Sequence, residues 1–150
     1  FSVEMREIDA LGMYDDAAEG MGKTFVTTEL GGGGTATPET AQIARKGVRN
    51  LLIHAGILQG QPVTAPSRML SQDDDRCFHV TNHGGLVDFN VTLGDTVAEG
   101  DLIARLWDSQ HTGLPPREIR AQMGGIVIAR HHPGLAQPGD CLAVLATELT

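Results

Sequence analysis

One acidic residue, Glu29, has a sequence context that is typical of a catalytic carboxylate. Glu29 ends a run of aromatic and β-branched residues, 25–28, and the four glycines 31–34 follow almost at once. The run predicts a short buried strand, and the glycines predict a sharp turn or a close approach of backbone to another group. An acid at the tip of a buried strand, facing backbone without side chains, is a common arrangement for a catalytic carboxylate. The alternative is a salt-bridged glutamate that precedes a flexible loop.

The glycines do not match a nucleotide-binding loop. A P-loop places Lys and then Ser or Thr after its last glycine, and here Thr35 follows Gly34 directly. A dinucleotide fingerprint needs a third glycine at position 36, which is Ala36. The sequence therefore argues against a nucleotide site at these glycines.

Strand and helix patterns alternate before Glu29. Residues 2–8 predict a first strand and residues 12–22 predict a short helix, while 23–29 form the strand that ends at Glu29. An aspartate at 15 or 16 could cap the short helix, and the glycines at 20 and 22 could end it.

A second helix is predicted after the glycines. Thr37 and Pro38 have the residue types of an N-cap and a first helical position, and a stop is expected near 56–60. Its apolar residues recur at helical spacing: Ala41, Ala44, Val48, Leu51, Leu52, Ala55 and Leu58. The order βαβα predicts an α/β layer in a first domain, residues 1–67, with this helix packed on a sheet.

Residues 68–150 change to an all-β pattern and contain an internal repeat. Residues 84–88 match 124–128, and residues 100–106 match 139–145. Two similar halves predict a small β-sandwich with pseudo-twofold symmetry. The halves resemble those of lipoyl and biotinyl carrier domains, but the stretch that should hold the modified lysine, residues 107–122, has none. Lipoylation and biotinylation are therefore excluded.

The composition restricts the possible functions further. The formal net charge is −8 at pH 7, and Lys23 and Lys46 are the only lysines, so a nucleic-acid partner is not expected. No apolar run is long enough to cross a membrane. Cys77 and Cys141 form no CxxC motif, which favours free thiols in a reducing cytoplasm over a disulfide.

Three segments together resemble one enzyme family. They are residues 12–26, 27–34 and 46–58, with the sequences GMYDDAAEGMGKTFV, TTELGGGG and KGVRNLLIHAGIL. With the lipoyl-like β-domain, they are similar to the C-terminal half of the succinylglutamate desuccinylase/aspartoacylase family, and closest to its N-acetyl-diaminobutyrate deacetylase group. The resemblance implies a partial zinc-carboxypeptidase-like α/β layer followed by a barrel-sandwich hybrid.

The family resemblance implies a zinc-dependent amidohydrolase with Glu29 as its general base. Family members bind zinc through an HGxExxG-like turn and a later histidine, and neither motif is present. Cys77, His79 and His83 lie on a predicted strand and bend, where they would not converge on a metal. We therefore assign no metal ligand to this chain and expect the zinc ligands in a missing N-terminal portion, which would leave the chain inactive by itself.

The same resemblance implies a substrate site before Glu29. Relatives that act on acidic acyl amino acids carry a tyrosine and an arginine there. Here Tyr14 is present, but Asp15, Asp16 and Glu19 stand near the position of the arginine. We expect Tyr14, Asp15 and Glu19 to bind a substrate with a cationic side chain, such as N-acetyl-2,4-diaminobutyrate. The alternative for the aspartates is that they only cap and solvate the helix.

Two functions remain open. The first is the C-terminal part of a deacylase for a small N-acyl amino acid, acting with the rest of its catalytic domain and as a homo-oligomer. The second is a non-catalytic β-sandwich interaction or assembly module with an α/β appendage. The chain starts at Phe1 in a pattern typical of mid-strand, so we expect it to be a piece of a longer protein.

Overall fold

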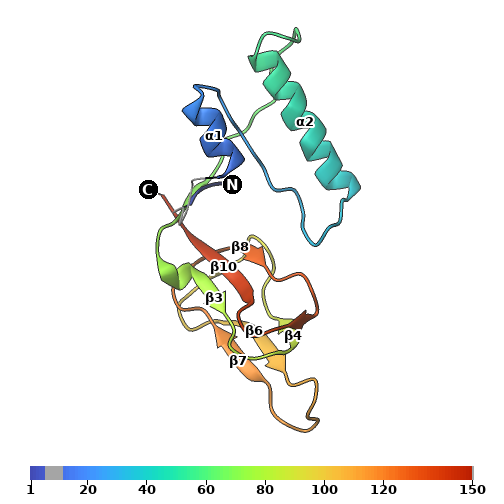
Figure 1. Ribbon diagram of the computed structural model, residues 1–150, viewed down its shortest axis with the longest axis vertical. Helices are drawn as coiled ribbons and strands as arrows, with labels where there is room; N and C mark the ends of the chain where they lie inside the picture. Colours follow the sequence, from blue (N-terminus) through green and yellow to red (C-terminus); the bar gives the residue numbers. More distant parts are fainter. Residues whose placement is uncertain (6–11, 150) are drawn as a thin grey trace. The chain divides into compact units, whose positions relative to one another are not determined.

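The computed structural model describes residues 1–5 and 12–149 (Figure 1). The chain separates into two compact units. The β-unit comprises Phe1–Arg6 and Ser67–Thr150, and the helical unit comprises Glu7–Pro66. No helix in the described ranges is long and apolar enough to cross a membrane.

The β-unit contains two sheets. One sheet has six strands in the order β1-β2-β10-β8-β5, with β3 also paired to β10, and the other has four in the order β7-β6-β4-β9. The bounds are β1 Ser2–Met5, β2 Met69–Gln72, β3 Phe78–Val80, β4 Gly85–Phe89, β5 Thr96–Val97, β6 Leu102–Trp107, β7 Arg117–Arg120, β8 Gly125–Arg130, β9 Leu135–Ala136 and β10 Cys141–Glu148, with a 3-10 helix, η1, at Asp75–Cys77. The all-β character predicted for this part of the chain is confirmed.

The repeat in the sequence corresponds to a repeat in strand pairing. In the first half β4 pairs with β6, and in the second half β8 pairs with β10, both antiparallel. Each half lends its short strand to the other: β5 pairs with β8, and β9 pairs with β4. The two halves therefore interlock, and neither sheet can form from one half alone.

The doubled glycines of the repeat allow close backbone approach. A Cβ added to Gly85 would overlap the carbonyl oxygen of Trp107, and one added to Gly125 would come within 2.8 Å of the carbonyl oxygen of Ala146. Gly85 also has a φ of 154°, which other residues rarely adopt. Both glycines are thus required by the same contact in equivalent places.

The Gly-Asp pairs of the repeat make equivalent turns. Asp101 accepts a hydrogen bond from the N–H of Ala98 at 2.8 Å, and Asp140 accepts one from the N–H of Gln137 at 2.8 Å. The preceding glycines, Gly100 and Gly139, have positive φ values of 89° and 98°. The predicted turn chemistry is confirmed.

A buried core fills the β-unit. Its largest fully buried side chains include Leu70, Ile103, Leu142 and Leu145.

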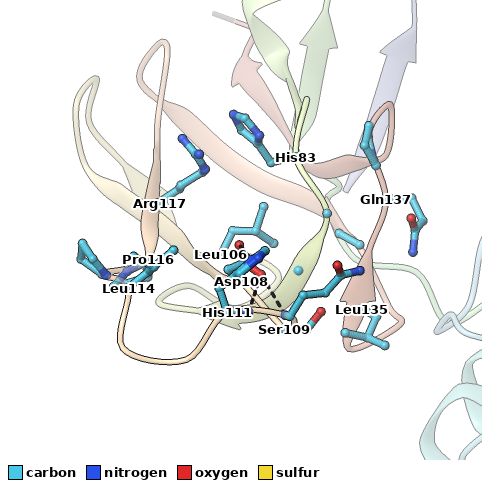
Figure 2. A pocket seen from close by; sticks show the side chains of 16 residues that line it. His83, Leu106, Asp108, Ser109, His111, Leu114, Pro116, Arg117, Leu135 and Gln137 are labelled. Atoms are coloured by element: carbon cyan, nitrogen blue, oxygen red, sulfur yellow. Dashed lines mark hydrogen bonds and ion pairs between the residues drawn. The ribbon is translucent and has the colours of Figure 1, made fainter.

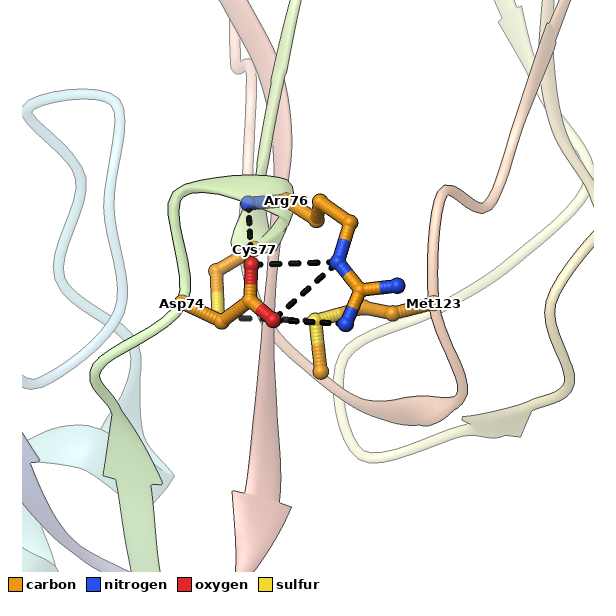
Figure 3. Close-up of polar contacts among 4 residues, drawn as sticks. All are labelled: Asp74, Arg76, Cys77 and Met123. Atoms are coloured by element: carbon orange, nitrogen blue, oxygen red, sulfur yellow. Dashed lines mark hydrogen bonds and ion pairs between the residues drawn. The ribbon is translucent and has the colours of Figure 1, made fainter.

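The turn before β3 is fixed by polar contacts of Asp74. Asp74 caps η1 by accepting a hydrogen bond from the N–H of Arg76 at 2.9 Å, and it also accepts one from the Arg76 guanidinium at 2.7 Å (Figure 3).

The thiol next to this turn is a packing group. The Sγ of buried Cys77 lies 3.8 Å from the Sδ of Met123 (Figure 3). Burial raises the pKa of the Cys77 thiol, so the nucleophilic thiolate is disfavoured.

The first strand differs from its prediction. β1 pairs in parallel with β2 of the β-unit, with Val3 opposite Leu70, so it extends a β-unit sheet instead of an α/β layer. The predicted strand continued over residues 6–8, which lie outside the described residues. The division into domains 1–67 and 68–150 stays a prediction.

The helical unit has two helices with well-formed ends. α1 is Tyr14–Gly20 and α2 is Pro38–His54. Thr37 caps α2, accepting a hydrogen bond from the N–H of Thr40 while the Thr40 hydroxyl accepts one from the N–H of Thr37. Both helices end in a left-handed glycine, Gly22 and Gly56, with φ of 69° and 72°. The start of α2 at Thr37 and Pro38 and the glycines that end the two helices are confirmed.

The α/β layer predicted for this part of the chain is wrong within residues 12–66. Residues 23–29 form no strand, and the described part of the helical unit contains only an isolated bridge between Gly32 and Thr35. A β-branched run favours extended backbone, but a strand also needs a partner to satisfy its N–H and C=O groups. Without a sheet in the described part of this unit, α2 also has no sheet surface to pack on. It has no buried residue, and Val48, which was expected to contact a sheet, is 56% exposed.

Candidate active-site residues

The helix α1 presents the predicted substrate residues on its surface. Tyr14 is its first residue, and Asp15 and Glu19 are four positions apart, on one face. All three side chains are in an exposed or partly exposed setting. The predicted capping role of the aspartates is wrong: the N-cap is Met13, which has no capping side chain, and Asp15 and Asp16 lie inside the first turn.

An aromatic contact joins α1 to the segment before Glu29. The rings of Tyr14 and Phe25 lie 5.5 Å apart at an interplanar angle of 61°, an edge-to-face arrangement that adds stability beyond simple burial. Phe25 is four residues before Glu29 in the same extended segment. The structure therefore places the predicted substrate helix and the predicted catalytic segment in one unit and in contact through these rings.

Glu29 is exposed at the end of this segment and leads into the glycine turn. Thr35 closes the turn with two bonds to the carbonyl oxygen of Gly32, from its N–H at 3.1 Å and from its hydroxyl at 2.8 Å. Gly33 and Gly34 both have positive φ, 61° and 69°, as in the tight turns that favour glycine at both central positions. The sharp turn predicted from the glycines is confirmed, whereas the predicted burial of the strand is wrong.

The described residues do not provide a zinc site. No group of three or more histidine, cysteine, aspartate or glutamate side chains converges in them to hold a metal ion. His79 is buried with both ring nitrogens engaged, Nδ1 with the Cys77 carbonyl at 3.1 Å and Nε2 as acceptor from the N–H of Gln122 at 3.1 Å. His79 is thus a core residue, and burial lowers its pKa.

A groove in the β-unit was not foreseen from the sequence (Figure 2). Its volume is about 730 Å³, within the usual range for small-molecule sites. It lies between the 108–117 hairpin, the turn before β4 and the segment around β9. Its polar side chains include His83, Asp108, His111 and Arg117. The sequence offered one indication of the groove: the hairpin that would hold the modified lysine in a carrier domain contains no lysine here.

Comparison with known proteins gives the chain its relatives. Residues 1–55 match the catalytic domain of succinylglutamate desuccinylase/aspartoacylase. Over 148 residues the chain is 41% identical to an N-alpha-acetyl-L-2,4-diaminobutyric acid deacetylase of Halomonas elongata, covering 97% of this chain and 43% of the relative. The chain belongs to the succinylglutamate desuccinylase/aspartoacylase family. The resemblance that the segments around Glu29 carried is confirmed.

Solved structures of this family match nearly the whole chain. The product-bound ectoine utilization protein EutE (DoeB) of Ruegeria pomeroyi is 51% identical with a TM-score of 0.92, covering 97% of this chain and 44% of that one. A succinylglutamate desuccinylase from Silicibacter sp. TM1040 is 49% identical with a TM-score of 0.92, covering 99% and 45%. The chain therefore has the family's fold and spans less than half the length of these relatives.

Proposed function

We propose that this chain is the C-terminal part of a zinc-dependent amidohydrolase that deacylates a small N-acyl amino acid, with Glu29 as general base. The observation that supports this most is the arrangement in the helical unit. An exposed carboxylate precedes a glycine turn, and the Tyr14–Phe25 contact holds an acidic helix against the same segment. Identity to a named deacetylase extends over 97% of the chain.

The proposed role of Glu29 is proton transfer. Its carboxylate would take a proton from the attacking water and return it to the amine as the amide C–N bond breaks. The glycines after it leave space for a substrate, because a Cβ added to Gly32 or Gly34 would meet no atom within 4 Å.

The zinc that the family implies does not fit the described residues, since they offer no converging set of three ligands. We propose that its ligands come from additional polypeptide of the kind that the longer relatives contain. On this proposal the chain alone is inactive. Homo-oligomerisation and a cytoplasmic location stay predictions.

The proposed substrate carries a cationic side chain, and N-acetyl-2,4-diaminobutyrate is the candidate. Asp15 and Glu19 place two carboxylates on one face of α1, and neither has an ion-pair partner among the described residues. Such a face attracts an ammonium group and repels a carboxylate.

The test is a substitution in a longer protein that contains this chain. Glu29→Gln keeps the size of the side chain and removes its basicity, so kcat for N-acetyl-2,4-diaminobutyrate should fall by about 10²–10⁴-fold. Glu39→Gln, in the first turn of α2, is the matched control and should leave kcat unchanged. A chelator should abolish the activity and zinc should restore it. Full activity of Glu29→Gln would contradict the assignment.

A second pair of variants tests the substrate class. In the same longer protein, Asp15→Asn with Glu19→Gln should lower kcat/KM for the cationic substrate by about tenfold relative to an N-acetyl amino acid with an acidic side chain. An unchanged ratio would leave the carboxylates with a structural role only. If the longer protein has no deacylase activity at all, the non-catalytic interaction module becomes the better assignment.

A further inference from the structure

The groove of the β-unit has the features of a ligand site. It is lined entirely by residues of one unit, namely 83–85, 106, 108–111, 114–117 and 135–138. We propose that it binds a small organic carboxylate with an apolar tail, and that Arg117 holds the carboxylate. This proposal is independent of Glu29 and of the function proposed above.

Arg117 differs from the other arginines between residues 67 and 149 of the β-unit. Each of those has a polar partner: Glu148 for Arg68, Asp74 for Arg76, Asn90 for Arg105, Glu118 for Arg120, and the Val91 carbonyl for Arg130. Arg117, at the start of β7, makes no side-chain hydrogen bond or ion pair with any described residue. Its planar guanidinium can therefore take both oxygens of an incoming carboxylate.

The acid in the groove does not compete for Arg117. Asp108 accepts three hydrogen bonds: from the N–H of Gln110 at 2.8 Å, from the N–H of His111 at 3.1 Å, and at 3.0 Å from the Nδ1 of His111 (Figure 2). These bonds hold the pKa of the Asp108 carboxyl below its usual range. The Asp108 carboxylate is therefore satisfied by hydrogen bonds within the hairpin. The Arg117 guanidinium remains available to an external anion, in a chain whose net charge is −8.

A second donor lines the same groove. The backbone of His83 is fixed by Thr81, whose hydroxyl oxygen accepts from the His83 N–H at 3.1 Å and whose hydroxyl donates to the His83 carbonyl at 3.0 Å. The imidazole of His83 has no hydrogen bond within the described part of the chain. It can donate a ring N–H to an anion that is bound by Arg117.

The apolar part of the lining favours an anion with an alkyl tail over a compact anion such as phosphate. The groove is bordered by leucine and proline side chains: Leu106, Leu114, Pro115, Pro116, Leu135 and Pro138. A compact hydrated anion such as phosphate gains nothing from these contacts. A carboxylate with a short alkyl chain places its charge on Arg117 and covers apolar surface with its tail.

The experiment is a titration of the full 150-residue chain, ¹⁵N-labelled, followed by amide NMR shifts. Hexanoate should give saturable shifts at residues 83–85, 108–114 and 135–137, with a millimolar Kd. Hexanamide, which has the same tail without the charge, should give no saturable shifts there. Inorganic phosphate should bind at least tenfold more weakly than hexanoate.

Variants identify the arginine. Arg117→Gln should weaken hexanoate binding about tenfold, and Arg117→Lys, which keeps the charge but loses the planar fork, should give an intermediate Kd. Arg105→Gln on the neighbouring strand β6 is the matched control and should bind like the unaltered chain. Equal shifts with hexanamide, equal affinity for phosphate, or equal effects of the Arg117 and Arg105 variants would each overturn the proposal.

Discussion

Every fully buried side chain in the described residues lies in the β-unit, between Leu70 and Ala146, and none lies in the helical unit. The β-unit closes its core because its two halves exchange short strands. The helical unit forms through local signals, the Thr37 cap and the glycine ends, while Ile43, Val48 and Leu51 stay about half exposed on α2.

The two units differ in what stabilises them: local caps and turns in the helical unit, and a packed core in the β-unit. Caps and turns specify where a helix begins and ends, at about 1 kcal/mol each, but most of a helix's stability in proteins comes from packing of its apolar face. The β-unit contains its own packing partners. The helical unit leaves the apolar side chains Ile43, Val48 and Leu51 of α2 about half exposed, and it also carries the candidate catalytic residue.

The largest effect is expected where β4 and β6, the paired strands of the first half of the β-unit, come into close backbone contact. Gly85→Val should destabilise the β-unit by about 3 kcal/mol or more, because the new side chain overlaps the Trp107 carbonyl. Urea unfolding monitored through the fluorescence of Trp107, the single tryptophan, measures it. Gly124→Ala is the control, since its Cβ would meet the Val97 carbonyl oxygen at an ordinary 3.5 Å. Equal stability of the two variants would contradict a requirement for glycine at position 85.

Matched leucine truncations compare the units directly. Leu145→Ala, at a fully buried site, should cost about 2–5 kcal/mol. Leu51→Ala on α2, 47% exposed, should change stability by less than about 0.5 kcal/mol. Tryptophan fluorescence reports the first change and far-UV circular dichroism the second. A cost of several kcal/mol at Leu51 would mean that the helical unit has a core of its own.

The β-unit should also lose stability as the pH falls below about 6.5, the ordinary pKa of histidine. Burial lowers the pKa of His79, so the unfolded chain takes up a proton before the folded one. The contribution of neutral His79 to the free energy of unfolding is complete above that pH and is lost on acidification. The free energy should fall by at most about 1.4 kcal/mol per pH unit. Unfolding free energies between pH 7.5 and 5 should show the slope in the exposed His111→Gln control and lose it in His79→Gln.

The smallest effect belongs to the helical unit. Thr37→Ala removes the cap of α2 and should lower the local stability of that helix by about 1 kcal/mol. Amide hydrogen exchange of residues 40–44 should accelerate about fivefold, while exchange in β10 stays unchanged. Thr64→Ala, outside both helices, is the control. Loss of protection in β10 would show that the two units unfold together.

Much of the fold could be predicted from the sequence. Thr37, Pro38 and the glycines at 22 and 56 defined the helices because capping depends on residues within one turn. The repeat of residues 84–88 at 124–128 indicated two related halves. The strand at 23–29 was predicted wrongly, since β-branched residues favour extended backbone without indicating whether a neighbouring strand exists.

The candidate site could be predicted only in part. Glu29 and the glycine turn follow from local sequence, and Tyr14 became a candidate by family resemblance. The contact of Tyr14 with Phe25, and the groove around Arg117, depend on packing between residues that are distant in sequence. The functional assignments of Glu29, Tyr14, Asp15 and Glu19 stay proposals until the variants are measured.

The sequence by itself determined the start of α2, the glycines that end both helices, the Gly-Asp turns and the family, because each depends on residue types at short, fixed spacing. The tertiary structure decided that β1 joins the β-unit and that the short strands exchange between halves. It also decided that Arg117 lines a groove and has no polar partner in the described part of the chain. Those outcomes depend on which backbone edges and side chains find one another across long stretches of chain, and local spacing does not encode that choice.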